Sequence, residues 1–442
     1  MTAIQDLAEK AAELNRQTLS QDVTHHAKRA VIDWYASLFP GLSTPPVQLL
    51  ERALTEDLDH GGARLALGRA ATARAAALIN GTAAHAAEVD DSFREAMYHP
   101  GAATIAAALA AGQAAGIDGA AFLRAVVVGY EVSTRIGVVM GRRHYKFWHS
   151  TGTIGTFGAT GAASAVRGLG SEPFAHALAT AATFAAGLQQ AFRMDSMSKP
   201  LHAGRAAEAG VLAASLAGIG LTGSLDVLDG EAGLGQAMSD GPDWSGVAET
   251  LGRDFHVTRL TFKNHIGCGH TFAAIDGALA LQALHGIAAQ DIARVHVGTY
   301  RPALDIACYE RPASANEARF SLKYVVASAL VHGSVRMAAY EPPRLEDAAT
   351  RSLMERVSVA IDPELDAAFP KQRAARIDIE TTDGRRLSYL QPNRKGDPEE
   401  PLSDAEVEGK FLELASPVLG DERARNLVAR LWSLETQASL PT

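Results

Sequence analysis

The chain has 442 residues, a formal net charge of −9 and only two cysteines, Cys268 and Cys308. A chain of this length is too long for one compact core, so two domains are expected. Both signs of charge are spread along the sequence and no Lys/Arg run forms a basic patch, which argues against a nucleic-acid partner. The few, widely separated cysteines favour a reducing compartment over a disulfide scaffold.

The N-terminal segment is amphipathic and charged, without the apolar core of a signal peptide. No uninterrupted apolar span is long enough to cross a bilayer. These features predict a cytoplasmic protein that has no membrane partner.

Up to about residue 255 the sequence is rich in alanine and leucine with interspersed glycines, which is typical of closely packed helices. Apolar residues recur at helical spacing over 27–38 and 122–136, and Asp118 is a candidate N-cap. The glycines at 152, 155 and 158 are spaced like part of a phosphate loop. No strand precedes them, so close helix packing is the preferred interpretation.

Residues 80–100 (NGTAAHAAEVDDSFREAMYHP) contain the first candidate site cluster. Asn80-Gly81 predicts a turn, and a short helical stretch is expected to begin at His85. Glu88, Asp90 and Asp91 crowd three carboxylates into four positions, which raises at least one pKa unless cations or water relieve the repulsion. An exposed acidic turn is the alternative for any single one of them. His99 then precedes Pro100 at an expected helix start.

Two further clusters follow, at 142–153 (RRHYKFWHSTGT) and 197–204 (MSKPLHAG). In the first, His149 precedes three hydroxyl residues among basic and aromatic neighbours, a composition that suits a pocket for a small anion. In the second, Pro200 predicts a break in the helix at Lys199 and His202, with a new helix from Ala203. A cation and an imidazole at a chain break favour anion binding, with a solvated basic loop as the alternative.

After about residue 260 the pattern changes to that of an α+β module. Residues 295–297 and 357–361 alternate as strands do, and 376–389 predict a hairpin that turns at Asp383-Gly384. Helices are expected around 272–284 and 321–330. The tail, 404–433, returns to a helical pattern that we expect to rejoin the first domain. The predicted domains are 1–258 completed by 402–442, all helical, and 259–401, an α+β lid.

The α+β module carries two more candidate segments. Residues 262–271 (FKNHIGCGHT) place Lys263, His265 and His270 around a glycine-rich bend. A zinc site made of His265, Cys268 and His270 is disfavoured because the ligands are too tightly spaced, so no metal is predicted. Tyr324, in SLKY, is either a core aromatic or an acid/base phenol.

The inventory of histidines, lysines and carboxylates suits proton removal next to a carboxylate. That reaction needs a base, an acid for the departing group and cations that stabilise the developing enediolate. A serine or cysteine nucleophile is poorly supported, since no GxSxG elbow occurs.

In their order along the chain, these segments resemble the MmgE/PrpD family, which includes 2-methylcitrate dehydratase, cis-aconitate decarboxylase and iminodisuccinate epimerase. The resemblance is carried by AKRAVIDWYASLFPG, NGTAAHAAEVDD, HPGA, GYEVSTRIG, FWHSTGTIGTFGA, MSKPLHAGRAA and FKNHIGCGHT. It implies a large helical domain, a smaller α+β lid, an active site in the cleft between them, and a homodimer. It also implies cofactor-independent chemistry on a small anionic di- or tricarboxylate.

Matched motif by motif, the resemblance places the family's site residues on His99, His149, Lys199, His270 and Tyr324. We expect His149, Lys199 and His270 to form the acid/base and carboxylate-binding core, with His99 and Tyr324 completing the pocket. Asp90 or Asp91 would orient or relay protons, and the expected substrate-binding residues are Glu88, Ser92, His202 and Lys263. Glu88 stands where the decarboxylase-like pattern has aspartate, and the segment from Asp91 to His99 is one residue longer than usual and lacks Trp-His-Pro. These differences leave the substrate open.

We therefore expect a lyase that acts on a small polycarboxylate, resembling either 2-methylcitrate dehydratase or aconitate decarboxylase. An epimerase of an iminodisuccinate-like dicarboxylate is the nearest alternative. Asp90-Asp91 with Glu95 gives a fainter likeness to magnesium-dependent isoprenoid synthases, but a second acidic motif is missing. A non-catalytic helical binding protein is the third alternative.

Overall fold

The computed structural model describes residues 1–192 and 196–441, and the chain divides into two compact units. Unit 1 comprises Met1–Thr261 and Ser403–Thr442, and unit 2 comprises Phe262–Leu402. Unit 1 is mainly helical and unit 2 is α+β, so the predicted fold class, mainly α with an α+β second domain, is confirmed. Within the described residues, no helix is both long enough and apolar enough to span a bilayer.

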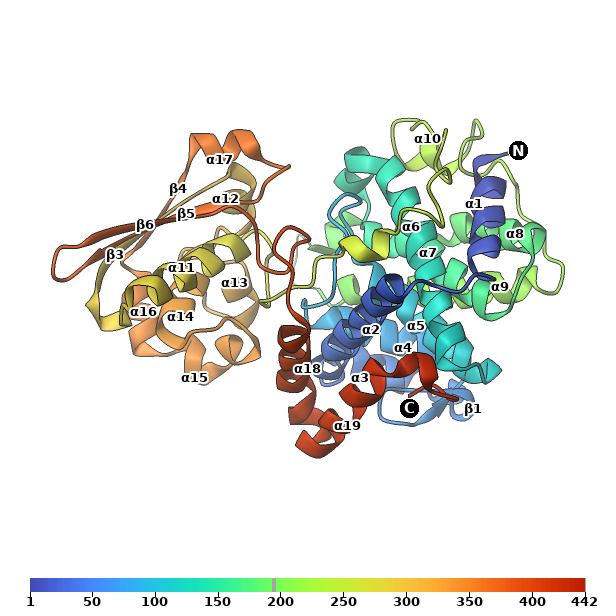
Figure 1. The fold of residues 1–442 in the computed structure, drawn as a ribbon, viewed down its shortest axis with the longest axis horizontal. Coiled ribbons are helices and arrows are strands. Elements are labelled where there is room, and N and C mark those ends of the chain that lie inside the picture. The colour runs from blue at the N-terminus through green and yellow to red at the C-terminus, as the bar shows by residue number, and fades with distance from the viewer. Residues whose placement is uncertain (193–195, 442) are drawn as a thin grey trace. The chain divides into compact units, whose positions relative to one another are not determined.

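Figure 1 shows the helices of unit 1, several of them stacked around α7. They are α1 (Ala3–Leu14), α2 (Gln21–Gly41), α3 (Pro45–Ala53), α4 (Ala73–Ala86), α5 (Pro100–Ala115), α6 (Gly119–Phe147), α7 (Ser150–Val166), α8 (Ser171–Phe184), α9 (Ser198–Ala217), α10 (Leu234–Met238), α18 (Asp404–Leu419) and α19 (Asp421–Trp432). A short antiparallel pair, β1 (Leu58–Arg64) and β2 (Ala70–Ala71), was not predicted.

Helices α5, α6, α8 and α9 all pack against α7. The small residues of α7 allow this close approach. Every residue from Ser150 to Ala165 is buried. A methyl group at Gly158 would lie 2.4 Å from the Thr104 hydroxyl of α5, and one at Gly152 would lie 2.4 Å from the Ala186 carbonyl. The interpretation of these glycines as close-packing residues is therefore confirmed.

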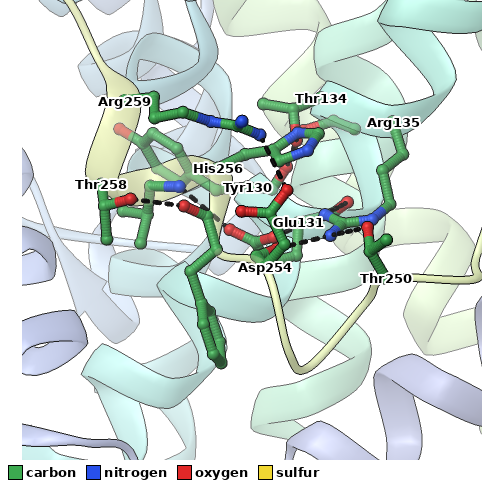
Figure 2. Close-up of polar contacts among 12 residues, drawn as sticks. Tyr130, Glu131, Thr134, Arg135, Thr250, Asp254, His256, Thr258 and Arg259 are labelled. Carbon is green, nitrogen blue, oxygen red and sulfur yellow. Dashed lines mark hydrogen bonds and ion pairs between the residues drawn. The ribbon is translucent and has the colours of Figure 1, made fainter. Parts of the chain in front are cut away.

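Helix α6 begins where its sequence predicts, and a buried ion pair joins it to a later segment. Asp118 caps it by accepting the Ala121 N–H, as predicted. Figure 2 shows the buried ion pair of Glu131 and Arg135 on this helix. Arg135 also donates to the Asp254 carbonyl at 2.7 Å, and Glu131 accepts the Val257 N–H at 3.0 Å. These bonds fix the segment before residue 261 to α6.

Two local predictions in unit 1 are wrong. Asn80 and Gly81 lie inside α4, and His85 lies in its last turn rather than at a helix start. Asn80 is accommodated because its amide bonds the Arg64 carbonyl and the Ala66 N–H, and Gly81 lets the backbone of Gly204 approach closely. These are tertiary contacts, and local turn propensity cannot anticipate them.

The predicted helix break at Pro200 is also wrong. Helix α9 begins at Ser198, so Lys199 and Pro200 lie in its first turn. Proline is tolerated there because the N–H groups of the first turn have no partner within the helix. Lys199 and His202 therefore lie at a helix N-terminus rather than in a loop.

In unit 2 a four-stranded sheet has the order β4-β3-β5-β6, with β3 and β4 parallel and the other pairs antiparallel. The elements are α11 (Phe272–His285), β3 (Ile292–Thr299), α12 (Arg301–Ile306), α13 (Ala315–Arg319), α14 (Leu322–His332), α15 (Pro342–Leu345), α16 (Ala348–Met354), β4 (Val357–Ile361), α17 (Pro363–Ala368), β5 (Ala375–Thr381) and β6 (Arg386–Gln391).

The predicted hairpin is confirmed as β5 and β6, with Gly384 at φ +88° in the turn. Alternate residues of β5 are buried, and α11 packs on the sheet.

Candidate active site

Four histidines from four helices meet in unit 1. His99 is the N-cap of α5, His149 is the N-cap of α7, His202 lies near the start of α9, and His85 lies in the last turn of α4. Ring centroids are 5.1 Å apart for His85 and His99, 5.4 Å for His85 and His149, and 5.1 Å for His149 and His202. We refer to these four residues as the histidine cluster.

The start of α5 shows how two members of the cluster, His99 and His149, come together. Pro100 occupies the first turn of α5 and leaves His99 in extended backbone, where its side chain is not part of the helix surface. The His99 N–H donates to the Thr151 hydroxyl at 3.2 Å, which ties the start of α5 to that of α7. The N-termini of α5, α7 and α9, with their partial positive charge, therefore lie beside the cluster.

Hydrogen bonds fix the ring orientations of the cluster. His85 Nδ1 lies 2.7 Å from Asp90 Oδ2, and His99 Nδ1 lies 2.6 Å from the Asp91 carbonyl. Because both partners accept, each Nδ1 carries a proton. His149 Nδ1 and His202 Nδ1 are 2.9 Å apart, so one of these two nitrogens donates to the other.

The two aspartates have different surroundings, although both are buried. Asp90 lies against the histidines, with its Oδ2 also 3.6 Å from His99 Nδ1. Asp91 accepts the Tyr130 hydroxyl at 2.8 Å and the Gly101 N–H at 3.0 Å. Burial, followed by the charge of Asp33, raises the pKa of Asp91 to about 8. The two hydrogen bonds oppose this shift but do not cancel it.

Lys199 forms an ion pair with Glu88, a residue in the left-handed backbone region at φ +60°. Both side chains are about one-fifth exposed, so solvent or a ligand can reach the pair. Ser92, predicted to bind substrate, is joined through its backbone to Thr261.

Electrostatics favour the neutral form of two of these imidazoles, His149 and His202. Burial, followed by the positive charges of His85 and Lys199, holds the pKa of His149 well below its usual value. Burial and the same two neighbours lower the pKa of His202 to about 4. Neutral imidazoles beside a lysine and three helix N-termini form an environment that favours an anion.

The remaining predicted residues belong to unit 2. His270 Nδ1 lies 3.0 Å from the Tyr300 hydroxyl, and burial together with Arg373 and Arg394 lowers the pKa of His270 to about 3. Lys263 is buried. Tyr324 is buried and donates to the Ala339 carbonyl, which are the contacts of a core aromatic. Their catalytic and binding roles stay predictions.

The two histidines considered as zinc ligands, His265 and His270, bond to different partners. His265 Nε2 lies 2.7 Å from Asp276 Oδ1, in a buried pair separate from the His270–Tyr300 contact. Across 1–192 and 196–441, no three histidine, cysteine or acidic side chains are grouped as metal ligands would be.

His85 and Tyr130 lie at the site but were not among the predicted site residues. In the sequence, His85 was only the expected start of a helical stretch, and its position five residues before Asp90 was the available signal. Tyr130 gave no signal of its own, since a tyrosine at helical spacing among apolar residues is usually core. Its bond to Asp91 depends on how α6 packs.

The chain matches both domains of one family. The MmgE/PrpD N-terminal domain matches residues 5–246, and the MmgE/PrpD C-terminal domain matches residues 265–434.

Among similar proteins, the cis-aconitate decarboxylase-like protein oryM of Aspergillus oryzae is 28% identical over 467 aligned residues, which cover 98% of this chain and 95% of that protein. Human cis-aconitate decarboxylase is 28% identical, covering 81% of this chain and 76% of its own length. The Aspergillus terreus enzyme is 25% identical, covering 94% and 90%. The histidine cluster thus lies in a chain that belongs to the MmgE/PrpD family.

Proposed function

We propose that this protein is a cofactor-independent lyase that acts on a small di- or tricarboxylate, and that decarboxylation of cis-aconitate is the first reaction to test. The observation that carries the proposal is the convergence of His99, His149, His202 and Lys199 at three helix N-termini. The relatives described as cis-aconitate decarboxylases support the choice of substrate.

Binding a polyanion changes the protonation of the cluster. A carboxylate beside His149 or His202 favours the imidazolium and raises a pKa that burial has lowered. Substrate binding is therefore expected to draw protons into the site. Lys199 would exchange part of its contact with Glu88 for a substrate carboxylate.

The proposed chemistry follows from these charges. Loss of CO2 breaks a carbon–carbon bond and leaves its electron pair on the substrate, where an adjacent unsaturated carboxylate delocalises it. Lys199 and the helix N-termini stabilise that charge, and an imidazolium, proposed to be His149, returns a proton to carbon. In a dehydration, neutral His149 would instead remove the proton.

The test is incubation of the purified protein with cis-aconitate, citrate and 2-methylcitrate in deuterated water, followed by NMR and CO2 measurement. We expect CO2 release and one deuterium in the product, without added metal and after dialysis against EDTA. Label exchange without elimination would indicate an epimerase. Absence of turnover of all three by folded protein would refute the proposal.

Two variants connect the activity to the site. Lys199→Met and His149→Gln are expected to lower kcat/KM by about 100-fold or more, because each removes a charge-stabilising or proton-transferring group. Lys10→Met is the matched control, since Lys10 is exposed on α1 and pairs with Glu13. Equal losses in all three variants would contradict the assignment.

A further inference from the structure

His85 is a fully buried histidine with one partnered and one unpartnered ring nitrogen. Its Nδ1 donates to Asp90, whereas its Nε2 is buried without a hydrogen-bond partner among the described residues. Leaving a buried polar nitrogen unpaired costs free energy, and apolar side chains could fill the same space without that cost. The position therefore has a requirement beyond packing.

The bond to Asp90 determines what this imidazole can do. With its proton held on Nδ1, neutral His85 has its lone pair on Nε2, and a second proton there makes the cation. Asp90 is itself buried and fixes the ring through one short, charge-assisted bond of 2.7 Å. The orientation of the His85 ring is therefore fixed by Asp90.

The ring of His85 stacks on that of His149, with centroids 5.4 Å apart and planes 27° from parallel. Charged or titratable groups from three helices act on His149: His85 from α4, His99 from α5, and Lys199 and His202 from α9. Glu88 pairs with Lys199, and His144 of α6 is bonded to Thr153 in the first turn of α7. At this separation inside a protein, a charge on His85 acts strongly on His149.

We propose that His85, oriented by Asp90, is a positioning residue for His149: it holds the His149 ring in place, and its charge controls whether His149 carries a proton. This inference deepens the proposed function and rests on it, since His149 is the proton-transferring group there. His85 acts through His149 and need not touch substrate.

Removing the His85 imidazole should change the pKa of His149 in a predictable direction. Its positive charge contributes, after burial, to lowering the pKa of His149, so its loss raises that pKa. His149 would then stay protonated up to a higher pH in the ligand-free protein. In the pH profile of kcat/KM, the limb that reports the titration of His149 shifts to higher pH by about one unit.

The experiment uses His85→Asn and His85→Gln, whose amides can still donate to Asp90 but carry no titrating nitrogen. The readouts are the titration of His149 by histidine NMR in ligand-free protein and the pH profile of kcat/KM. His176→Asn, on α8 and bonded to the Gly223 backbone, is the control.

We expect both His85 variants to raise the His149 titration midpoint and shift the profile, and the control to change neither. A folded variant of either kind with an unchanged midpoint would overturn the inference, because a purely structural role would lower stability without moving it. If the wild-type protein turned over no carboxylate, the proposed function would fail while the NMR titration still tested the link from His85 to His149.

Discussion

The backbones of Ser92 and Thr261 are joined by two hydrogen bonds, each N–H donating to the other residue's carbonyl at 2.9 Å. Ser92 follows the paired aspartates, and Thr261 is the last residue of unit 1 before the chain enters unit 2. The neighbouring residues strengthen the link, since His256 stacks on Phe93 with ring centroids 5.2 Å apart. The segment that contains Asp90 and Asp91 is thus hydrogen-bonded to the residue at which the chain leaves unit 1.

Thr261→Pro removes one donor of this bridge and leaves the Ser92 carbonyl unpaired. We expect a loss of about 1–3 kcal/mol in the free energy of unfolding, and lower activity because Asp90 and Asp91 are less well held. Urea denaturation and amide exchange at Ser92 measure the effect. Thr261→Ser, which keeps the N–H and the hydroxyl, is the control, and equal stability of the two variants would contradict the role of the bridge.

Asp91 makes stability depend on pH. Its folded-state pKa of about 8 lies above the ordinary value of 3.8, so the folded protein binds the proton more tightly than the unfolded chain. The stabilisation is complete below about pH 4 and is lost as pH rises through about 8. Asp91→Asn should remove this component.

Denaturation midpoints from pH 4 to 8 check that expectation. Relative to Asp91→Asn, the wild-type protein should lose stability progressively across this range. Asp229→Asn, at an exposed loop carboxylate, serves as the control. Parallel pH dependence of wild type and Asp91→Asn would show that Asp91 does not titrate in this range.

Glycine packing between α6 and α7 gives a test of the fold. A methyl group at Gly129 would lie 2.5 Å from the Gly158 carbonyl oxygen and 2.5 Å from Thr104 Cγ2, so Gly129→Ala should cost about 1–3 kcal/mol. Gly409, exposed on α18, has open space around it, and Gly409→Ala should stabilise by up to about 1 kcal/mol. Thermal denaturation distinguishes the two variants. A Gly129→Ala protein as stable as wild type would contradict the close packing of α6 and α7.

The buried pair of Glu131 and Arg135 in Figure 2 predicts that a single substitution lowers stability more than the double substitution does. Arg135→Met leaves the Glu131 carboxylate buried without its cation, and should cost about 3–5 kcal/mol. Because burial already raises the pKa of Glu131, this cost should shrink at low pH, where the carboxyl takes up a proton.

The double variant Glu131→Gln/Arg135→Met should recover part of the loss, since no buried charge remains and the amide can still accept the Val257 N–H. Urea denaturation at pH 5 and pH 8 measures both effects. A double variant less stable than Arg135→Met would contradict the argument.

Local patterns in the sequence were sufficient to predict many helices, strands and turns. The cap at Asp118, the hairpin turn at Gly384 and the close-packing glycines of α7 were all predictable, because each depends on neighbours in the chain or on the absence of a side chain. The motif order was also sufficient to predict the family, which the domain matches confirm.

Only the tertiary structure decided how the site residues meet. Asn80-Gly81 and Pro200 are helix breakers by local propensity, yet both lie within helices because tertiary contacts or a first-turn position remove the penalty. The contact of His85 with His149 spans 64 residues of sequence, and the raised pKa of Asp91 comes from burial beside α6. Sequence determines which groups are available, but distances, tautomers and desolvation arise only when separate helices pack together, since each is a property of neighbours that are remote along the chain.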